Sequence, residues 1–336
     1  YFIKKNKIQL YIATSYSYAS ISSLAIRIST HKKIKTLMIG GNYYRIFEDY
    51  EQSLKGYYFI SKKRLQKFKE NEEKVNLADK YFETRLSGKI SLNDKEDNTL
   101  GNELDAIRAF TNKLEISKDD FIKKYSIDNK RPIFVIATHG FKDANHLYGK
   151  FLFDDFLDEI EFILEKIKDN NYFHWFIKKH PMSDFYKESD VVKNILEKKK
   201  IKNVQLIDNN ISTKSILEIA DRIFTSRGTI AIEYAALGRC AYTSSRSYFS
   251  ELGFSQLIKD KKELSDCLNF REIKKLSAND IINAKCALFI MKEETLRENI
   301  YNLSDPQRHV GKDEFMNQFN KLMNSKNKFL IVNKAY

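Results

Sequence analysis

The stretch IFTSRGTIAIEYAALGRCAY, residues 223–242, indicates the fold class of the chain. A short apolar run at Ile223–Phe224 meets a small polar turn, residues 225–229. A helical pattern follows and stops at Gly238, a residue typical of helix C-termini. A second apolar run begins at Cys240, so the order is strand, turn, helix, strand. A turn of small residues leaves backbone N–H groups free at the start of a helix, which suits a phosphate.

Glu233 lies one turn into that predicted helix, and the stretch alone leaves its role open. If the carboxylate faces a ligand, it can accept hydrogen bonds from sugar hydroxyls. The alternative is an ordinary turn with a solvated glutamate, because strand–turn–helix units with few glycines are common. Whether Glu233 binds a ligand or is solvated therefore has to be judged from the rest of the sequence.

The same alternation of strand and helix extends over the region from residue 129. We expect apolar strands at residues 133–137, 173–177, 204–207, 223–224 and 241–243. Amphipathic helices are expected between them at residues 151–167, 185–198 and 212–220. Continuous apolar strands that alternate with helices form a parallel sheet covered on both faces. The second half of the chain is therefore predicted to be one α/β lobe.

The first part of the chain contains a single strand–helix–strand unit, residues 8–39. A doubly wound lobe needs more strands, so we expect part of this lobe to precede Tyr1. Residues 42–125 read as mainly helical, and the polar segment before Pro132 reads as a linker. The predicted domains are a partial first lobe at 1–128, a second lobe at 129–300 and a helical tail at 301–336.

Composition restricts the classes of partner and compartment. The chain has 336 residues with 58 Lys and Arg against 45 Asp and Glu, a formal net charge of +13, which favours an anionic partner. The lysines are spread along the chain and no zinc-finger or RNA-binding signature is present, so nucleic acid is not expected. Three widely spaced cysteines without a CxxC pair favour the reducing cytoplasm. No apolar run reaches the ~18 residues of a membrane span.

Polar clusters follow the predicted strands of the second lobe. His139 and Asp143 come after the strand at 133–137, and a Lys178-Lys179-His180-Pro181 run follows the strand at 173–177. The turn at residues 226–229 follows the strand at 223–224. Because the carboxyl ends of parallel strands meet at one edge of a sheet, we expect these clusters to converge there.

Two spaced motifs carry a family resemblance. The lysine-rich strand end with His180-Pro181, and SRGTIAIEYAALG beginning 45 residues after Pro181, resemble the nucleotide-binding lobe of bacterial capsule and surface-polysaccharide glycosyltransferases of the GT-B fold. The run from His139 through Asp143, followed by LFDD at 152–155, strengthens the likeness. Retaining β-Kdo transferases and CDP-glycerol glycerophosphotransferases are the nearest families. The resemblance covers residues 128–245 and implies two Rossmann-like lobes with parallel sheets, the N-terminal one incomplete.

The resemblance implies a donor site for a nucleotide-activated sugar. His180 would bind a phosphate oxygen, with Lys178 or Lys179 adding positive charge. The residues expected around the phosphate at the helix N-terminus are Ser226, Gly228 and Thr229, and Glu233 would hold the ribose hydroxyls. Arg227 either binds phosphate or pairs with Asp221 or Glu218.

The resemblance also implies two catalytic residues. Asp143 would be the nucleophile of a retaining double displacement, whereas an inverting enzyme would take its base from the first lobe. His139 would orient Asp143 or bind a carboxylate of the donor. The alternative for Asp143 is a loop-capping residue beside Asn145. We expect no metal and no cofactor besides the donor, because lysine, histidine and a helix dipole can neutralise the leaving phosphate and the chain lacks a DxD triplet.

These expectations describe a glycosyltransferase. The leading donor is CMP-Kdo, and the acceptor is a growing capsule or lipopolysaccharide glycan or glycolipid at the inner face of the cytoplasmic membrane. The positive charge would suit peripheral attachment to an anionic membrane surface. The alternatives are a CDP-glycerol glycerophosphotransferase and a non-catalytic module that binds nucleotide or glycan.

Overall fold

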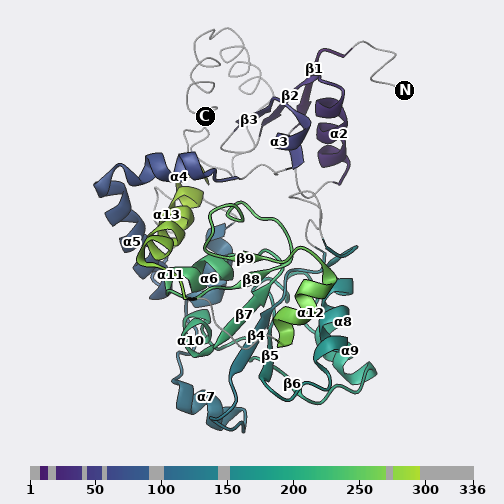
Figure 1. Cartoon of the computed structure of the whole chain (residues 1–336), viewed down its shortest axis with the longest axis vertical. Helices are drawn as coiled ribbons and strands as arrows, with labels where there is room; N and C mark the ends of the chain where they lie inside the picture. Colours follow the sequence, from purple (N-terminus) through teal and green to yellow (C-terminus); the bar gives the residue numbers. More distant parts are fainter. Residues whose placement is uncertain are drawn as a thin grey trace. The chain divides into compact units, whose positions relative to one another are not determined.

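The computed structural model describes residues 8–13, 20–39, 44–54, 59–90, 102–142, 152–269 and 275–295 (Figure 1). The chain divides into two compact units. The first unit contains Tyr1–Ser53, Leu92–Leu100 and Ile290–Tyr336, and the second contains Leu54–Ser91 and Gly101–Phe289. No helix in the described ranges is both long enough and apolar enough to span a bilayer.

The first unit contains the predicted strand–helix–strand motif. Strand β1 (Leu10–Ala13) pairs in parallel with β2 (Lys35–Ile39), and helix α2 (Ser20–His31) connects them. The structure adds an antiparallel strand, β3 (Tyr44–Phe47), followed by helix α3 (Tyr50–Leu54). The sequence did not predict β3, because a run of four residues is too short to show a strand period.

The second unit is built on a six-stranded sheet in the order β6-β5-β4-β7-β8-β9. Every neighbouring pair is parallel, which confirms the predicted α/β sheet. The strands are β4 (Ile133–Ala137), β5 (His174–Lys178), β6 (Val204–Leu206), β7 (Arg222–Thr225), β8 (Tyr242–Thr243) and β9 (Gln256–Leu257). All five residues of β4 are buried, as expected for a central strand covered on both faces.

Helices cover both faces of this sheet (Figure 1). Helices α8 (Phe156–Ile167), α9 (Val191–Lys198) and α12 (Lys261–Asn269) lie on one side, and α10 (Thr213–Ile219) and α11 (Ile230–Ala236) lie on the other. Helix α8 begins at the N-cap Asp155, whose side chain accepts the Asp158 N–H at 2.8 Å. The predicted N-cap Ser212 is confirmed, since its hydroxyl accepts the Lys214 N–H at 3.2 Å. Burial of apolar side chains at helical spacing holds α8 on the sheet.

The predicted domain boundary at residue 128 does not match the division into units. Helices α4 (Lys62–Lys69), α5 (Glu72–Leu86), α6 (Asn102–Phe110) and α7 (Lys118–Lys124) belong to the second unit with the sheet. Contacts distant in sequence hold them there: Leu114 bridges Ile211, and the Ile116 N–H donates to Ser215 Oγ at 2.9 Å. Helix α13 (Ala278–Thr295) crosses from the second unit into the first. The expected tail at 301–336 lies outside the described residues.

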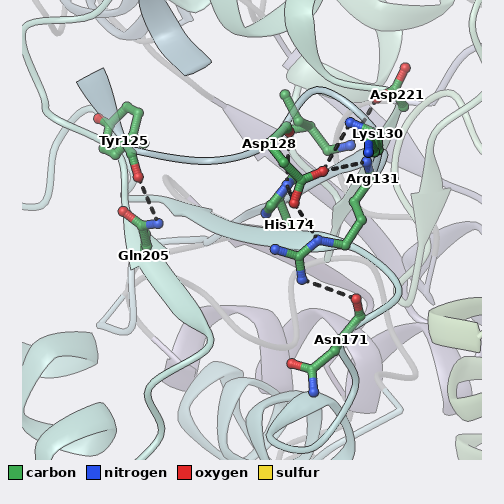
Figure 2. A network of polar contacts seen from close by, with 9 residues as sticks. Tyr125, Asp128, Lys130, Arg131, Asn171, His174, Gln205 and Asp221 are labelled. Atoms are coloured by element: carbon green, nitrogen blue, oxygen red, sulfur yellow. Dashed lines mark hydrogen bonds and ion pairs between the residues drawn. The ribbon is translucent and has the colours of Figure 1, made fainter. Parts of the chain in front are cut away.

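The predicted linker before β4 is held by a polar network (Figure 2). Asp128 accepts hydrogen bonds from the Lys130 and Arg131 amides and from Arg131 Nε, at 2.9, 3.0 and 2.9 Å. Although desolvation acts in the opposite direction, these bonds hold the pKa of Asp128 well below its usual range. The buried His174 ring lies 3.0 Å from the Asp128 carbonyl oxygen. The network fixes where the chain enters β4.

Gly238 ends helix α11 with a φ of +83°, and a Cβ there would lie 3.3 Å from Ile281 Cδ1. Gly238→Ala is expected to lower the free energy of unfolding by about 1 kcal/mol from backbone strain, with an added packing penalty. The control is Gly253→Ala, where φ is +88° and no atom of the described residues lies within 4 Å of the added Cβ. Urea denaturation should show a smaller loss for Gly253→Ala than for Gly238→Ala; equal losses would mean that α13 does not pack on this turn.

Candidate functional site

A pocket opens at the carboxyl edge of the six-stranded sheet, within the second unit. It encloses about 500 Å³, part of it open to solvent. Its lining comes from the ends of β4, β5 and β7 and from the starts of α10 and α11, together with α5 and α6. The lining residues are Arg85, Ala109, Ala137, Thr138, Lys178, Lys179, His180, Pro181, Thr213, Thr225, Gly228, Thr229, Ile230 and Glu233. This is the edge at which ligands bind in open α/β sheets.

Five of the residues predicted for the donor site line this pocket together: Lys178, His180, Gly228, Thr229 and Glu233. Lys179, predicted as the alternative to Lys178, lines it as well and donates to the Ser189 carbonyl at 3.3 Å. The expected convergence of the strand ends is therefore observed. What these residues bind stays a prediction.

Lys178 supplies a positive charge in an environment that disfavours it. Desolvation by burial, reinforced by the nearby charge of Lys113, lowers the pKa of Lys178 to about 8, while Glu233 acts in the opposite direction. Among the described residues, no carboxylate forms an ion pair with the Lys178 ammonium within 4.0 Å. An anion bound in the pocket would stabilise the charged form of this lysine.

Arg85 is a pocket residue that the sequence did not reveal. Its Nε donates to Glu233 Oε1 at 2.7 Å, and both side chains are almost fully buried. Glu233, expected to hold ribose hydroxyls, therefore already shares one carboxylate oxygen with an arginine of α5. The two residues are 148 positions apart, so no local pattern could have paired them.

Gly228 allows the chain to turn tightly above β7. A Cβ at Gly228 would lie 2.8 Å from Thr225 Oγ1, closer than ordinary contacts permit. The Gly228 N–H donates to the same hydroxyl at 3.3 Å. Glycine thus lets the turn close over the end of β7 and bring Thr229 and Ile230 to the pocket.

Ser226 and Arg227 are not among the lining residues, which differs from the prediction. The Ser226 hydroxyl donates to the buried carboxylate of Glu159 on α8, and Ser244 donates to the other oxygen of that carboxylate. The Arg227 guanidinium lies 5.0 Å from the centre of the Phe156 ring and is also buried. Both side chains are turned into the protein because Glu159 and Phe156 offer a polar and an aromatic partner there. The contacts described for Arg227 are with the Phe156 ring and, through its charge, with Glu159, whereas the ion-pair partners predicted as the alternative were Asp221 and Glu218.

Glu159 is an acidic group held in the interior. Desolvation raises its pKa to about 7, against the opposing effects of the Ser226 and Ser244 hydroxyls and the charge of Arg227. Nothing in the local sequence distinguishes Glu159 from the exposed acidic residues of the same helix, apart from its place on the apolar face.

The predicted catalytic pair is described only in part. The His139 ring packs edge-on against Phe156 and against His180, with centroid distances of 4.5 and 5.4 Å. Asp143 lies outside the described residues. The start of its loop is anchored by the buried Glu188, which accepts the N–H groups of Phe141 and Lys142 at 2.9 and 2.7 Å. His139 therefore sits beside the pocket residue His180, and the role of Asp143 stays a prediction.

Thr213, at the start of α10, lines the pocket and is only 2% exposed. Its hydroxyl finds no hydrogen-bond partner among the described residues, an arrangement that costs free energy in a folded protein. Among the described residues, no group of three or more His, Cys, Asp or Glu side chains is arranged to hold a metal ion.

Comparison with known proteins gives similarities in structure only. No protein-family model matches the sequence, and no curated protein matches it. The chain is similar to the β-Kdo 2,4-transferase of KpsC from Thermosulfurimonas dismutans, at 11% identity over 84% of this chain and 86% of that one, with a TM-score of 0.43. The chain is also similar to the β-Kdo 2,7-transferase of the same protein, at 11% identity over 84% of this chain and 78% of that one, with a TM-score of 0.43.

A third similar structure is the UDP-GlcNAc 2-epimerase of Methanocaldococcus jannaschii. Its identity to this chain is 15%, over 86% of this chain and 77% of the epimerase, with a TM-score of 0.36. Similarities this weak do not bear on function, so the function has to be inferred from the residues of the pocket.

The raised pKa of Glu159 predicts a pH dependence of stability. The unfolded chain releases this proton near the ordinary glutamate pKa of 4.5, whereas the folded protein keeps it until about pH 7. The contribution of Glu159 to stability therefore falls as pH rises from 4.5 to 7, by up to ~1.4 kcal/mol per pH unit, and is constant above that range. Glu159→Gln should remove this dependence, measured by urea denaturation from pH 5 to 8. Parallel curves for the two proteins would contradict the assignment.

The unpartnered hydroxyl of Thr213 predicts a stabilising substitution. Thr213→Val keeps the shape and removes the buried polar group, so the unliganded protein should gain about 1 kcal/mol of unfolding free energy. Thr213→Ser, which keeps the hydroxyl, is the control and should show no gain. A loss of stability in Thr213→Val would mean that the hydroxyl has a bonding partner in solution.

Proposed function

We propose that the chain is a glycosyltransferase and that the pocket at the sheet edge binds its nucleotide-sugar donor. The supporting observation is that Lys178, His180, Gly228, Thr229 and Glu233, the residues of the two motifs that resemble GT-B glycosyltransferases, line one pocket. Parallel strands bring the two motifs to one edge of the sheet although 45 residues separate them, and the residues that the resemblance assigns to the donor line one pocket there.

The charges in the pocket suit a phosphate-linked leaving group. Among the described lining residues, Lys178 and Lys179 are accompanied by one acidic side chain, Glu233, and that carboxylate is already engaged by Arg85. In the proposed reaction the donor phosphate binds against Lys178 and His180. Both side chains, with the amides of the β7–α11 turn (residues 226–229), stabilise the negative charge that develops as the sugar departs. No metal is required for that step.

The finer assignment follows the sequence resemblance. The proposed donor is CMP-Kdo, and the proposed acceptor is a growing capsule or lipopolysaccharide glycan at the inner face of the cytoplasmic membrane. The net charge of +13 supports contact with anionic lipid or acidic glycan there. Asp143 is the proposed nucleophile of a retaining displacement, with His139, which packs on His180, orienting it or binding the donor carboxylate.

A thermal-shift panel with CMP, CDP, UDP, GDP and ADP tests the donor assignment. A ligand at 100 times its Kd should stabilise the folded protein by ~2.7 kcal/mol, and we expect this shift for CMP or CDP. His180→Ala and Lys178→Ala should each lower the affinity about tenfold, the value of one charge-assisted contact. The matched control is Lys199→Ala. Lys199 lies at the C-terminal end of α9, does not line the pocket and pairs with Glu161, so this variant should bind nucleotide as the wild type does.

The pattern of shifts separates the alternatives. A shift with UDP or GDP instead would keep the pocket as a donor site and overturn the CMP-Kdo assignment. A CDP shift together with turnover of CDP-glycerol would favour the glycerophosphotransferase. No shift with any of the five nucleotides would overturn the proposed function.

A further inference from the structure

Glu159 lies behind the pocket and connects three elements of the second unit. It is on helix α8, it is 4% exposed, and it does not line the pocket. One carboxylate oxygen accepts the hydroxyl of Ser226, which follows β7, and the other accepts the hydroxyl of Ser244, which follows β8. A single carboxylate therefore fastens two strand ends to the helix.

One of these contacts lies directly beside the pocket. Ser226 is the first residue of the β7–α11 turn, and Gly228 and Thr229 of the same turn line the pocket. The Ser245 N–H also donates to the Ser226 carbonyl at 2.9 Å, so the two strand ends hold each other as well. The position of the pocket wall thus depends on where Glu159 holds Ser226.

A second series of contacts connects Glu159 with His139, the candidate catalytic histidine. The charge of Arg227 acts on the Glu159 carboxylate, and the Arg227 guanidinium packs over Phe156. Phe156 also contacts the edge-on His139 ring, which in turn packs against His180. Phe156 and Glu159 are three residues apart, so they share one face of α8. Arg227 is the charged group acting on Glu159 among the described residues, and the neighbouring Asp158 is exposed.

We propose that Glu159 is a positioning residue: its ionised carboxylate holds the β7–α11 turn, and with it the wall of the pocket, in the geometry that binds ligand. An ionised carboxylate accepts from both serines at once, which is the arrangement observed. A protonated carboxyl carries its own donor, so one serine would have to turn and accept. The observed pair of serine contacts therefore belongs to the charged form, even though burial of that charge lowers the free energy of unfolding. The effect of Glu159 on ligand affinity rests on the proposed function, whereas its effect on the turn does not.

Hydrogen exchange of the unliganded protein at pH 8 tests the effect on the turn. Glu159→Gln keeps the size of the side chain but offers one acceptor and one donor group in place of two acceptors. Backbone amides of residues 226–229 and 244–247 should exchange about tenfold faster than in the wild type. The matched control is Glu161→Gln, two residues along the same helix, where the carboxylate pairs with Lys199 near the surface and the turn should be unaffected. Unchanged exchange in Glu159→Gln would overturn the proposal.

Calorimetric titration with CMP tests the effect on binding. The ratio of Kd in Glu159→Gln to Kd in the wild type should be about 1 at pH 6, where Glu159 is mostly protonated, and about 10 at pH 8. The same ratio for Glu161→Gln should stay at about 1 at both values. Comparing ratios removes the titration of the CMP phosphate and of Lys178 itself. A ratio that does not change with pH would mean a purely structural role and overturn the proposal.

Failure of the proposed function gives a different result from failure of this inference. If the wild type binds none of the nucleotides, the proposed function fails, and the exchange experiment decides on Glu159 alone. If Glu159→Gln does not fold, Ser244→Ala removes one of the two donors and leaves Ser226 in place. That variant should exchange faster over residues 244–247, and unaltered exchange there would overturn the proposal.

Discussion

The site depends on the register of β4 with the two strands beside it. Ala137, the last residue of β4, is paired with Lys178 of β5 and with Thr225 of β7. Because all three strands are parallel, the chain leaves the sheet at the same edge three times. The polar residues that follow each strand come together for this reason, before any side-chain contact between them is considered. A shift of one residue in either pairing would turn the strand's side chains to the opposite face and separate the lining of the pocket.

The pocket wall carries a second constraint, the buried ion pair between Arg85 and Glu233. Bringing two charges out of water is costly, and removal of one partner from such a pair typically destabilises a protein by ~3–5 kcal/mol because the other charge is stranded. The pair therefore links helix α5 to helix α11 and makes α5 part of the site. It also explains why helices preceding residue 128 belong to the unit that contains the sheet, where the sequence placed a domain boundary. Ser226 and Glu159 make a comparable link on the other side of the turn, through hydrogen bonds in place of an ion pair.

Much of the second unit was readable from the sequence because its features are local. Apolar runs such as Ile133–Ala137 give the strands, and residues such as Gly238 and Ser212 end or begin helices through backbone requirements of their own. Parallel topology then predicts the convergence of the strand ends. The features that escaped prediction depend on residues far apart in the chain. Arg85 meets Glu233 across 148 positions and Glu159 meets Ser244 across 85, and the inward direction of Ser226 follows only from that partner.

A crystal structure of the protein soaked with CMP or CDP would show whether the pocket at the carboxyl edge of the sheet is the ligand site. We expect phosphate density within hydrogen-bond distance of Lys178 Nζ and of the Gly228–Thr229 backbone, with Arg85 and Glu233 still paired beside it. Nucleotide bound elsewhere, for example at the opposite edge of the sheet near Asp128, with this pocket empty, would contradict it.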